Sequence, residues 1–363
     1  MSFSSRAIVA ALSSLISIHA VTAADVASSS AAAQRVIVES TNAALQGDSK
    51  RSIDGLSSVP AEQFAGADAG YRACMLNRFG RTSPPSWEPL TQDPFLEEAL
   101  TTYQKYWWQA LAAPKQIDAL DAQLRQRVRA MLGKQGDTDD WDELEKRVTE
   151  RIRAGGYYAQ LGRTPPLREL MVWRKQDSKN YDVALPEGSH KVRVELLDDF
   201  VSRGWSYYAR CGRGSSGGWA TEDRIYAVMP WFKSDLNSDA FRASLLGHET
   251  QHFSDMTRFP KLESWELEYR AKFTELWMAR ETMPTLLAKF AGSQSDDKNA
   301  PHTYANKRAL KVLRARLEAQ NITSSQPDLS DVPPDALRAA AREQLIQDSR
   351  DRAGAKQAPS GAK

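Results

Sequence analysis

The sequence has few cysteines, almost no net charge and no long apolar run beyond its N-terminus. Only Cys74 and Cys211 occur in 363 residues, and neither belongs to a CxxC pair of the kind that binds metals or exchanges disulfides. The formal net charge is +2, so the clustered basic charge of a nucleic-acid-binding protein is missing. No later segment approaches the roughly 20 apolar residues of a transmembrane helix. We expect no nucleic-acid partner and no transmembrane segment after signal cleavage.

The first 23 residues have the three parts of a secretory signal peptide. Arg6 supplies positive charge, an apolar stretch runs from Ala7 to about Val21, and Val21 and Ala23 fit the −3 and −1 positions of a cleavage site. An uncleaved anchor helix is the alternative, but the stretch is short and rich in serine for a membrane span. We therefore expect a periplasmic or secreted protein.

The expected export decides how the two cysteines are interpreted. In an oxidising compartment Cys74 and Cys211 can form a disulfide bond. The bond would tie a helical N-terminal region to the middle of the chain and contribute about 4–5 kcal/mol in the chain-entropy model. Two unpaired buried thiols are the alternative.

Apolar residues recur at helical spacing on both sides of a region that favours strands. Phe95–Leu111, Ile117–Leu132 and Thr138–Arg153 show the three- and four-residue steps of amphipathic helices. β-forming residues between turn signals predict short strands at Leu170–Trp173, Tyr181–Leu185, Lys191–Leu196 and Asp223–Trp231. We expect an α+β, mostly helical fold, with a small antiparallel sheet packed on one helix that carries the active site.

Two histidines lie four residues apart in the run His248-Glu249-Thr250-Gln251-His252. Residues i and i+4 share a helix face, so both imidazoles can bind one Zn²⁺ at about 2.0–2.1 Å. The Glu249 carboxylate can take the proton of a zinc-bound water and pass it to a leaving group. Beyond the signal region the chain has only four histidines, so two of them stand in this motif. We expect one zinc ion. The alternative is an ordinary helix whose two surface histidines have no function.

The segment from about residue 223 to residue 283 resembles the zincin metallopeptidases. It places a strand, the HExxH helix and a second helix in succession, as that family does. In the family, the strand before the motif helix is an edge strand that pairs with the substrate. The resemblance therefore implies a peptide or protein substrate that lies along Tyr226, Ala227 and Val228.

The resemblance also implies a third protein ligand. The metzincin branch is excluded because positions 255 and 258 are Asp and Arg rather than Gly and His. The gluzincin branch takes a glutamate from the next helix. Projected at about 100° per residue, Glu268 and Glu275 fall between two apolar arcs of that helix, where an unpaired carboxylate is costly. We expect Glu268 to be the ligand and Glu275 to replace it or to support another ligand.

Some alternatives for these acids stay open. Glu266 can serve as the ligand, and Glu268 can instead pair with Lys272 at i+4. Some gluzincins place an acid four residues after the ligand glutamate, where it orients a metal-bound histidine. Lys272 occupies that position here, so Asp255 or Glu275 must provide that acid.

Together these features predict an exported zinc-dependent metallopeptidase of the gluzincin-like branch. Two alternatives remain: a zinc-containing envelope protein that binds a partner with little or no hydrolysis, and a zinc hydrolase of non-peptide amides or esters. The expected divisions are a signal peptide (1–23), an Ala/Ser-rich linker (24–60), a helical region (61–165), a zincin-like catalytic region (166–290), C-terminal helices (291–350) and a disordered tail (351–363).

Overall fold

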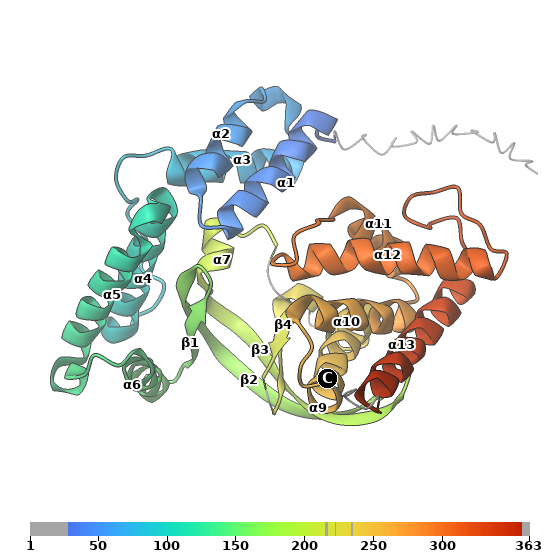
Figure 1. The fold of residues 1–363 in the computed structure, drawn as a ribbon. Helices are drawn as coiled ribbons and strands as arrows, with labels where there is room; N and C mark the ends of the chain where they lie inside the picture. Colours follow the sequence, from blue (N-terminus) through green and yellow to red (C-terminus); the bar gives the residue numbers. More distant parts are fainter. Residues whose placement is uncertain (1–27, 215–216, 222, 234, 358–363) are drawn as a thin grey trace, which may run out of the picture.

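Two helical parts are joined by a curled five-stranded sheet (Figure 1). The computed structural model describes residues 28–214, 217–221, 223–233 and 235–357. The chain is 59% helical with a small mixed sheet, which confirms the expected α+β, mostly helical fold. The expected signal peptide lies outside the described residues. None of the described helices combines the length and the apolar character of a membrane span.

The N-terminal part begins inside the region expected to be an Ala/Ser-rich linker with a helical stretch around residues 31–45, and α1 coincides with that stretch. Its elements are α1 (Ala31–Leu45), α2 (Ser49–Ser57), η1 (Ala61–Gln63), α3 (Gly66–Phe79), α4 (Pro94–Ala112), η2 (Pro114–Gln116), α5 (Ile117–Leu132), η3 (Gly133–Gly136) and α6 (Trp141–Ala154). The expected linker 24–60 therefore contains two packed helices. Ser40 and Ser52 are buried between them, with their hydroxyl oxygens 2.6 Å apart, and the Tyr71 hydroxyl lies 2.8 Å from that of Ser40. Small side chains let these helices lie close and share buried hydrogen bonds.

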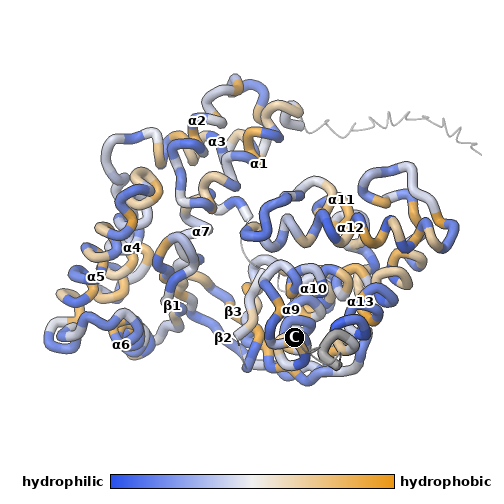
Figure 2. The backbone as a smooth tube through the Cα atoms, viewed as in Figure 1, coloured by the Kyte–Doolittle hydropathy of each residue, from blue (hydrophilic) through white to orange (hydrophobic). Residues whose placement is uncertain are grey.

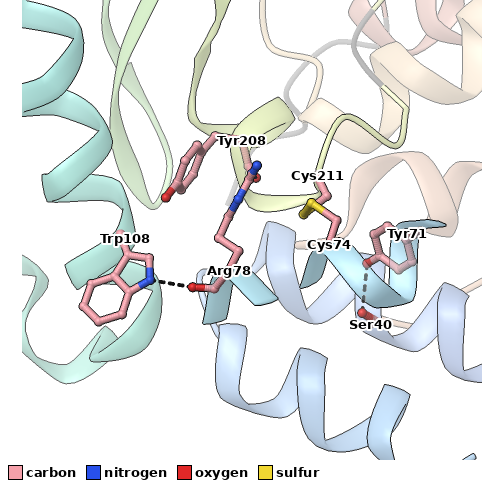
Figure 3. The surroundings of a disulfide bond; sticks show 7 residues. All are labelled: Ser40, Tyr71, Cys74, Arg78, Trp108, Tyr208 and Cys211. Carbon is pink, nitrogen blue, oxygen red and sulfur yellow. Dashed lines mark hydrogen bonds between the residues drawn. A yellow bond between two sulfur atoms is a disulfide. The ribbon is translucent and has the colours of Figure 1, made fainter. Parts of the chain in front are cut away.

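A disulfide bond between Cys74 and Cys211 confirms the expected pairing and links α3 to the turn after α7 (Gly204–Ala209). Figure 3 shows its surroundings. The Arg78 guanidinium lies over the Tyr208 ring, 4.3 Å from the ring centroid, and the Trp108 indole N–H donates to the Arg78 carbonyl over 2.8 Å. The bond thus fastens the N-terminal helices to the strand region.

The sheet follows the order β1-β2-β3-β5-β4. Its strands are β1 (Tyr158–Thr164), β2 (Leu167–Leu185), β3 (Gly188–Arg203), β4 (Gly218–Ala220) and β5 (Ile225–Val228). The expected strands 170–173 and 181–185 are two ends of one long strand, β2. The sheet was expected to be antiparallel, but β3 and β5 are parallel. This pairing is possible because the chain leaves β3 through α7 and crosses back before β5 begins.

The C-terminal part packs helices around one central helix. Its elements are η4 (Met229–Phe232), α8 (Asp239–Phe241), a π-helical turn (Arg242–Gly247), α9 (His248–Arg258), α10 (Ser264–Met278), α11 (Met283–Gly292), α12 (Pro301–Ala319) and α13 (Pro334–Gln357). Helix α10 contacts α9, α12 and α13, and every residue from 268 to 276 is buried. Hydrophobic and hydrophilic segments alternate along the outer helices in Figure 2, which is the pattern of amphipathic helices. The expected disordered tail 351–363 is helical to Gln357, and residues 358–363 lie outside the described part.

A fully buried arginine holds α13 against the helices of the site. Arg270 in α10 donates from Nε to Asp255 over 2.9 Å and from Nη2 to the Ser349 hydroxyl over 2.9 Å. It also contacts the carboxylates of Asp348 and Glu187. These contacts join α9, α10, α13 and the β2–β3 turn through one guanidinium, so the scaffold around α9 and α10 is fixed from several sides.

Candidate metal centre

The HExxH run forms the start of α9 and follows a π-helical turn without a break. Ser238 caps the preceding short helix, since its hydroxyl accepts the Phe241 N–H over 3.2 Å. Gly247 ends the π turn against α10, where a Cβ would meet the Met278 sulfur at 2.3 Å. The glycine therefore lets α9 and α10 approach closely. Helix α9 ends at Arg258, as the following Phe259-Pro260 predicted.

Three side chains from α9 and α10 converge on one point. His248 Nε2 and His252 Nε2 are 3.1 Å apart. The Glu268 carboxylate lies 3.5 Å from each of them, through Oε2 to His248 and through Oε1 to His252. The three ligand atoms lie within 4.8 Å of one another, so this group could hold a metal ion.

The spacing of these atoms fits a tetrahedral ion. Ligands at about 2.0–2.1 Å from a tetrahedral zinc stand about 3.3 Å apart. The observed separations of 3.1 Å and 3.5 Å lie on either side of that value. Two imidazole nitrogens and one carboxylate oxygen are also a donor set that zinc accepts, with a position left for a further ligand. The residues present therefore fit such an ion in the chemistry of their donors and in their close approach to one another.

Glu275, about two helical turns after Glu268 in α10, supports the first histidine. Its Oε2 lies 3.3 Å from His248 Nδ1, and its side chain is 3% exposed. A carboxylate at Nδ1 favours the tautomer that leaves Nε2 free to bind a metal. Burial raises the pKa of Glu275, but Lys272 and His248 outweigh burial and lower that pKa to about 2. Glu275 thus fills the expected supporting position and not the ligand position.

In the metal-free chain His248 lies between two carboxylates, those of Glu268 and Glu275. Burial lowers the pKa of His248, but Glu268 and Glu275 outweigh it and raise that pKa to about 10. Burial raises the pKa of Glu268, whereas the imidazoles of His248, His252 and His302 lower it well below its usual range. A proton on His248 therefore occupies the place of a metal ion, and an arriving ion must displace it.

Lys272 has a role that the sequence did not reveal. It is 3% exposed, and its ammonium lies 3.8 Å from Glu268 Oε2 and 3.6 Å from Glu275 Oε2. It also faces the Phe290 ring, 5.1 Å from the centroid. The expected alternative, a simple Glu268–Lys272 pair, is only part of the arrangement, because Lys272 spans both carboxylates while Glu268 lies closer to the histidines.

His302 reaches the centre from another helix. Its Nδ1 at the start of α12 lies 2.7 Å from Glu268 Oε2, and its side chain is 68% exposed. His252 Nδ1 is buried and makes no hydrogen bond to the described residues. The centre is therefore open on the side of His302, and the two histidines of α9 differ in how firmly they are held.

Two of the acids named as alternatives lie elsewhere. Asp255 is fully buried, where it accepts from Gln251 Nε2 over 2.9 Å and pairs with Arg270. Glu266 accepts the Glu263 N–H over 2.8 Å at the start of α10 and pairs with Arg352 over 2.9 Å. Both have structural partners, and neither belongs to the group of three that converges on the site.

Glu249 lies between the two histidines on α9 and is partly buried. Among the described residues its carboxylate has no ion pair or hydrogen bond, in contrast to Glu268 and Glu275. A carboxylate without a fixed partner is available to exchange protons.

The expected substrate strand has a different position from the one predicted. Tyr226, Ala227 and Val228 lie in β5, which pairs with β3 on one side and with β4 on the other. β5 is therefore internal, and β4 is the outermost strand of the described sheet on that side. β4 contacts α9. The three-residue β4 was missed because Gly218–Ala220 is too short to show a periodic pattern.

No family model matches the chain, and neither a curated protein nor a solved structure matches it. The geometry of the site is therefore the basis for any functional conclusion.

Proposed function

We propose that the protein is an exported zinc-dependent hydrolase of peptide bonds. The observation that carries the proposal is the convergence of His248 Nε2, His252 Nε2 and the Glu268 carboxylate on one point, with Glu275 at the other ring nitrogen of His248. The Cys74–Cys211 disulfide is compatible with an oxidising compartment. A periplasmic or secreted location belongs to the proposal.

Zinc and the residues around it have separate roles in the proposed hydrolysis. Zinc, when bound, supplies an acidified water and polarises a carbonyl group. Glu249 takes a proton from the attacking water and delivers it to the nitrogen of the leaving amine as the C–N bond breaks. Glu275 holds the His248 ring in one orientation, and Lys272 keeps the two glutamates of α10 in place by its position between them.

A peptide substrate is supported by the edge of the sheet. β4 (Gly218–Ala220) is the outermost described strand next to β5, and it contacts the helix that carries the histidines. An extended peptide can add to such an edge through backbone hydrogen bonds. In this proposal β4, rather than Tyr226, Ala227 and Val228 of β5, orients the scissile bond.

Replacement of the base tests the proposal. We expect Glu249→Gln to keep about one zinc per chain and to lose hydrolysis of a broad peptide library by about 100-fold or more, because the amide cannot accept the proton. Glu281→Gln is the matched control, since Glu281 is exposed after α10 and outside the site. Hydrolysis by Glu249→Gln at the level of that control would contradict the mechanism.

A further inference from the structure

A cavity of about 610 Å³ lies beside the π-helical turn that leads into α9. Its wall is made by the end of β2, the π-helical turn, the end of α10 and the first half of α13. None of His248, His252 and Glu268 lines it. The volume falls within the range of about 300–1,000 Å³ that small-molecule sites occupy. The cavity is therefore a separate candidate site, and it does not depend on the proposed hydrolysis.

Four arginines line this cavity: Arg242, Arg280, Arg338 and Arg342. Arg338 is held in place, since its Nη1 donates to the Ala279 carbonyl over 3.2 Å and its other amino group contacts Asp335. Within the described part of the chain, the guanidinium groups of the other three have no ion pair or hydrogen bond. These three arginines belong to different parts of the wall. Arg242 lies in the π-helical turn, Arg280 in the loop after α10, and Arg342 in α13, so they line the cavity from several directions.

The acids in the wall do not neutralise these arginines. Asp239 accepts the backbone N–H groups of Arg280 and Thr282 over 2.8 Å and 2.9 Å, and the Thr282 hydroxyl over 2.7 Å. Asp182 pairs with the Ser189 hydroxyl. Both carboxylates thus have partners other than the arginine side chains, and three free guanidinium groups outnumber two aspartates.

The remaining wall is largely apolar. Leu236, Leu246, Trp277 and Met278 line it together with Val183. A guanidinium offers several N–H donors in a planar fork that suits carboxylate and phosphate oxygens. A space with such forks on some sides and aliphatic and aromatic surface on the others is complementary to a molecule that has acidic groups on an apolar body.

We propose that this cavity binds a small organic anion that carries more than one carboxylate on an apolar chain. Arg242, Arg280 and Arg342 bind the acidic groups, and Trp277 and Leu246 contact the chain between them. Arg338, fixed by Ala279 and Asp335, shapes the wall. Because arginine stays protonated over the whole physiological range, binding weakens with salt and not with a moderate rise in pH.

Calorimetric titration of the full mature chain tests this site directly. The probes are the straight-chain dicarboxylates from succinate to suberate, the monocarboxylate hexanoate and the neutral diamides of the same dicarboxylates. We expect at least one dicarboxylate to bind at least tenfold more tightly than hexanoate, and the matching diamide not to bind. Equal affinity for a dicarboxylate and its diamide, or binding of neither, would overturn the proposal.

Arginine variants locate the binding within the chain. We expect Arg342→Gln and Arg280→Gln each to weaken binding of the best dicarboxylate by about tenfold, the usual effect of losing one charge-assisted hydrogen bond. Arg350→Gln is the matched control, because Arg350 lies on α13 with an exposed side chain and does not line the cavity. If all three variants bind equally well, the anion lies elsewhere and the assignment is wrong. Zinc content, measured on the same samples, stays at the wild-type level if the two sites are independent.

Discussion

His248 can be a protonated cation or a metal ligand, but not both at the same time. In the metal-free chain it is a buried cation between Glu268 and Glu275, with a pKa raised to about 10. As a metal ligand it must be neutral at Nε2. The same two carboxylates that hold its proton also hold the ring where a metal can replace that proton. A bound metal ion would therefore replace one positive charge by another at the same place.

The choice between Glu268 and Glu266 can be tested by a matched pair of substitutions. We expect Glu268→Gln to weaken zinc binding by at least tenfold more than Glu266→Gln, because only Glu268 faces both histidines. Glu266 contacts Arg352 and the start of α10, and a glutamine can keep both contacts as an acceptor. Competition titration with a zinc chelator measures the two affinities, and the reverse order would reassign the third ligand.

Individual elements owe their positions to buried polar contacts that are remote from the metal group. Helix α7 begins against Glu169 of β2, whose Oε1 accepts the N–H groups of Trp205 over 2.8 Å and Leu170 over 3.1 Å. Gly204, the first residue of α7, has a φ of +80°, and a Cβ there would meet Glu169 Oε1 at 1.9 Å. The turn from β3 into α7 therefore requires glycine, and it brings Cys211 to the place where it meets Cys74.

Glu169 makes the stability of the fold depend on pH. Burial raises its pKa from 4.5 to about 7, although its two backbone hydrogen bonds lower it. Between those pH values the folded chain keeps a proton that the unfolded chain has lost, so this group destabilises the fold as pH rises from about 4.5 to 7. The loss is roughly 3 kcal/mol at most. We expect Glu169→Gln, which stays neutral and can accept the same hydrogen bonds, to remove that decline.

Urea unfolding of both proteins at several pH values between 5 and 8 measures this effect. The wild-type chain should lose stability relative to Glu169→Gln as pH rises through that window. A difference between the two that stays constant with pH would show that Glu169 is ionised in the folded protein throughout.

At the scale of the whole molecule, one covalent link fastens the N-terminal helices to the strand region. The Cys74–Cys211 disulfide closes a loop of 137 residues between α3 and the turn after α7. In the chain-entropy model such a loop stabilises the fold by about 4–5 kcal/mol. We expect the double variant Cys74→Ala, Cys211→Ala to unfold at a correspondingly lower urea concentration. An unfolding free energy within about 1 kcal/mol of the wild-type value would mean that the chain-entropy model overstates this bond.

The residues of the metal group could be predicted from the sequence because they depend on local geometry. The i, i+4 spacing fixes His248 and His252 on one face of α9, and the apolar surroundings of Glu268 and Glu275 within α10 mark both as buried. The helices α4, α5 and α6 were predicted close to their actual bounds for the same reason. Each of these predictions rests on contacts within about one or two helical turns.

The features that the sequence did not reveal depend on contacts far apart in the chain. The parallel pairing of β3 with β5 and the short β4 outside it are set by packing and not by any local pattern. In the sequence, Lys272 and Arg270 have the residue types of solvent-exposed helix positions. In the structure, residues 268–276 of α10 are buried, and the two charges pair with acids of α9, α10 and α13. The Ala/Ser-rich composition of residues 24–60 is typical of a linker. The sequence predicted a helical stretch at 31–45, but it predicted neither α2 nor the packing of the two helices.

Zinc content of purified variants tests the metal centre most directly. Elemental analysis of the chain expressed with zinc should give about one zinc per chain for the wild type and for His190→Ala, which removes a histidine of β3 outside the site. His252→Ala should retain little or none after dialysis, because two protein ligands hold zinc far less tightly than three. An equal zinc content in His252→Ala and His190→Ala would contradict the proposed centre.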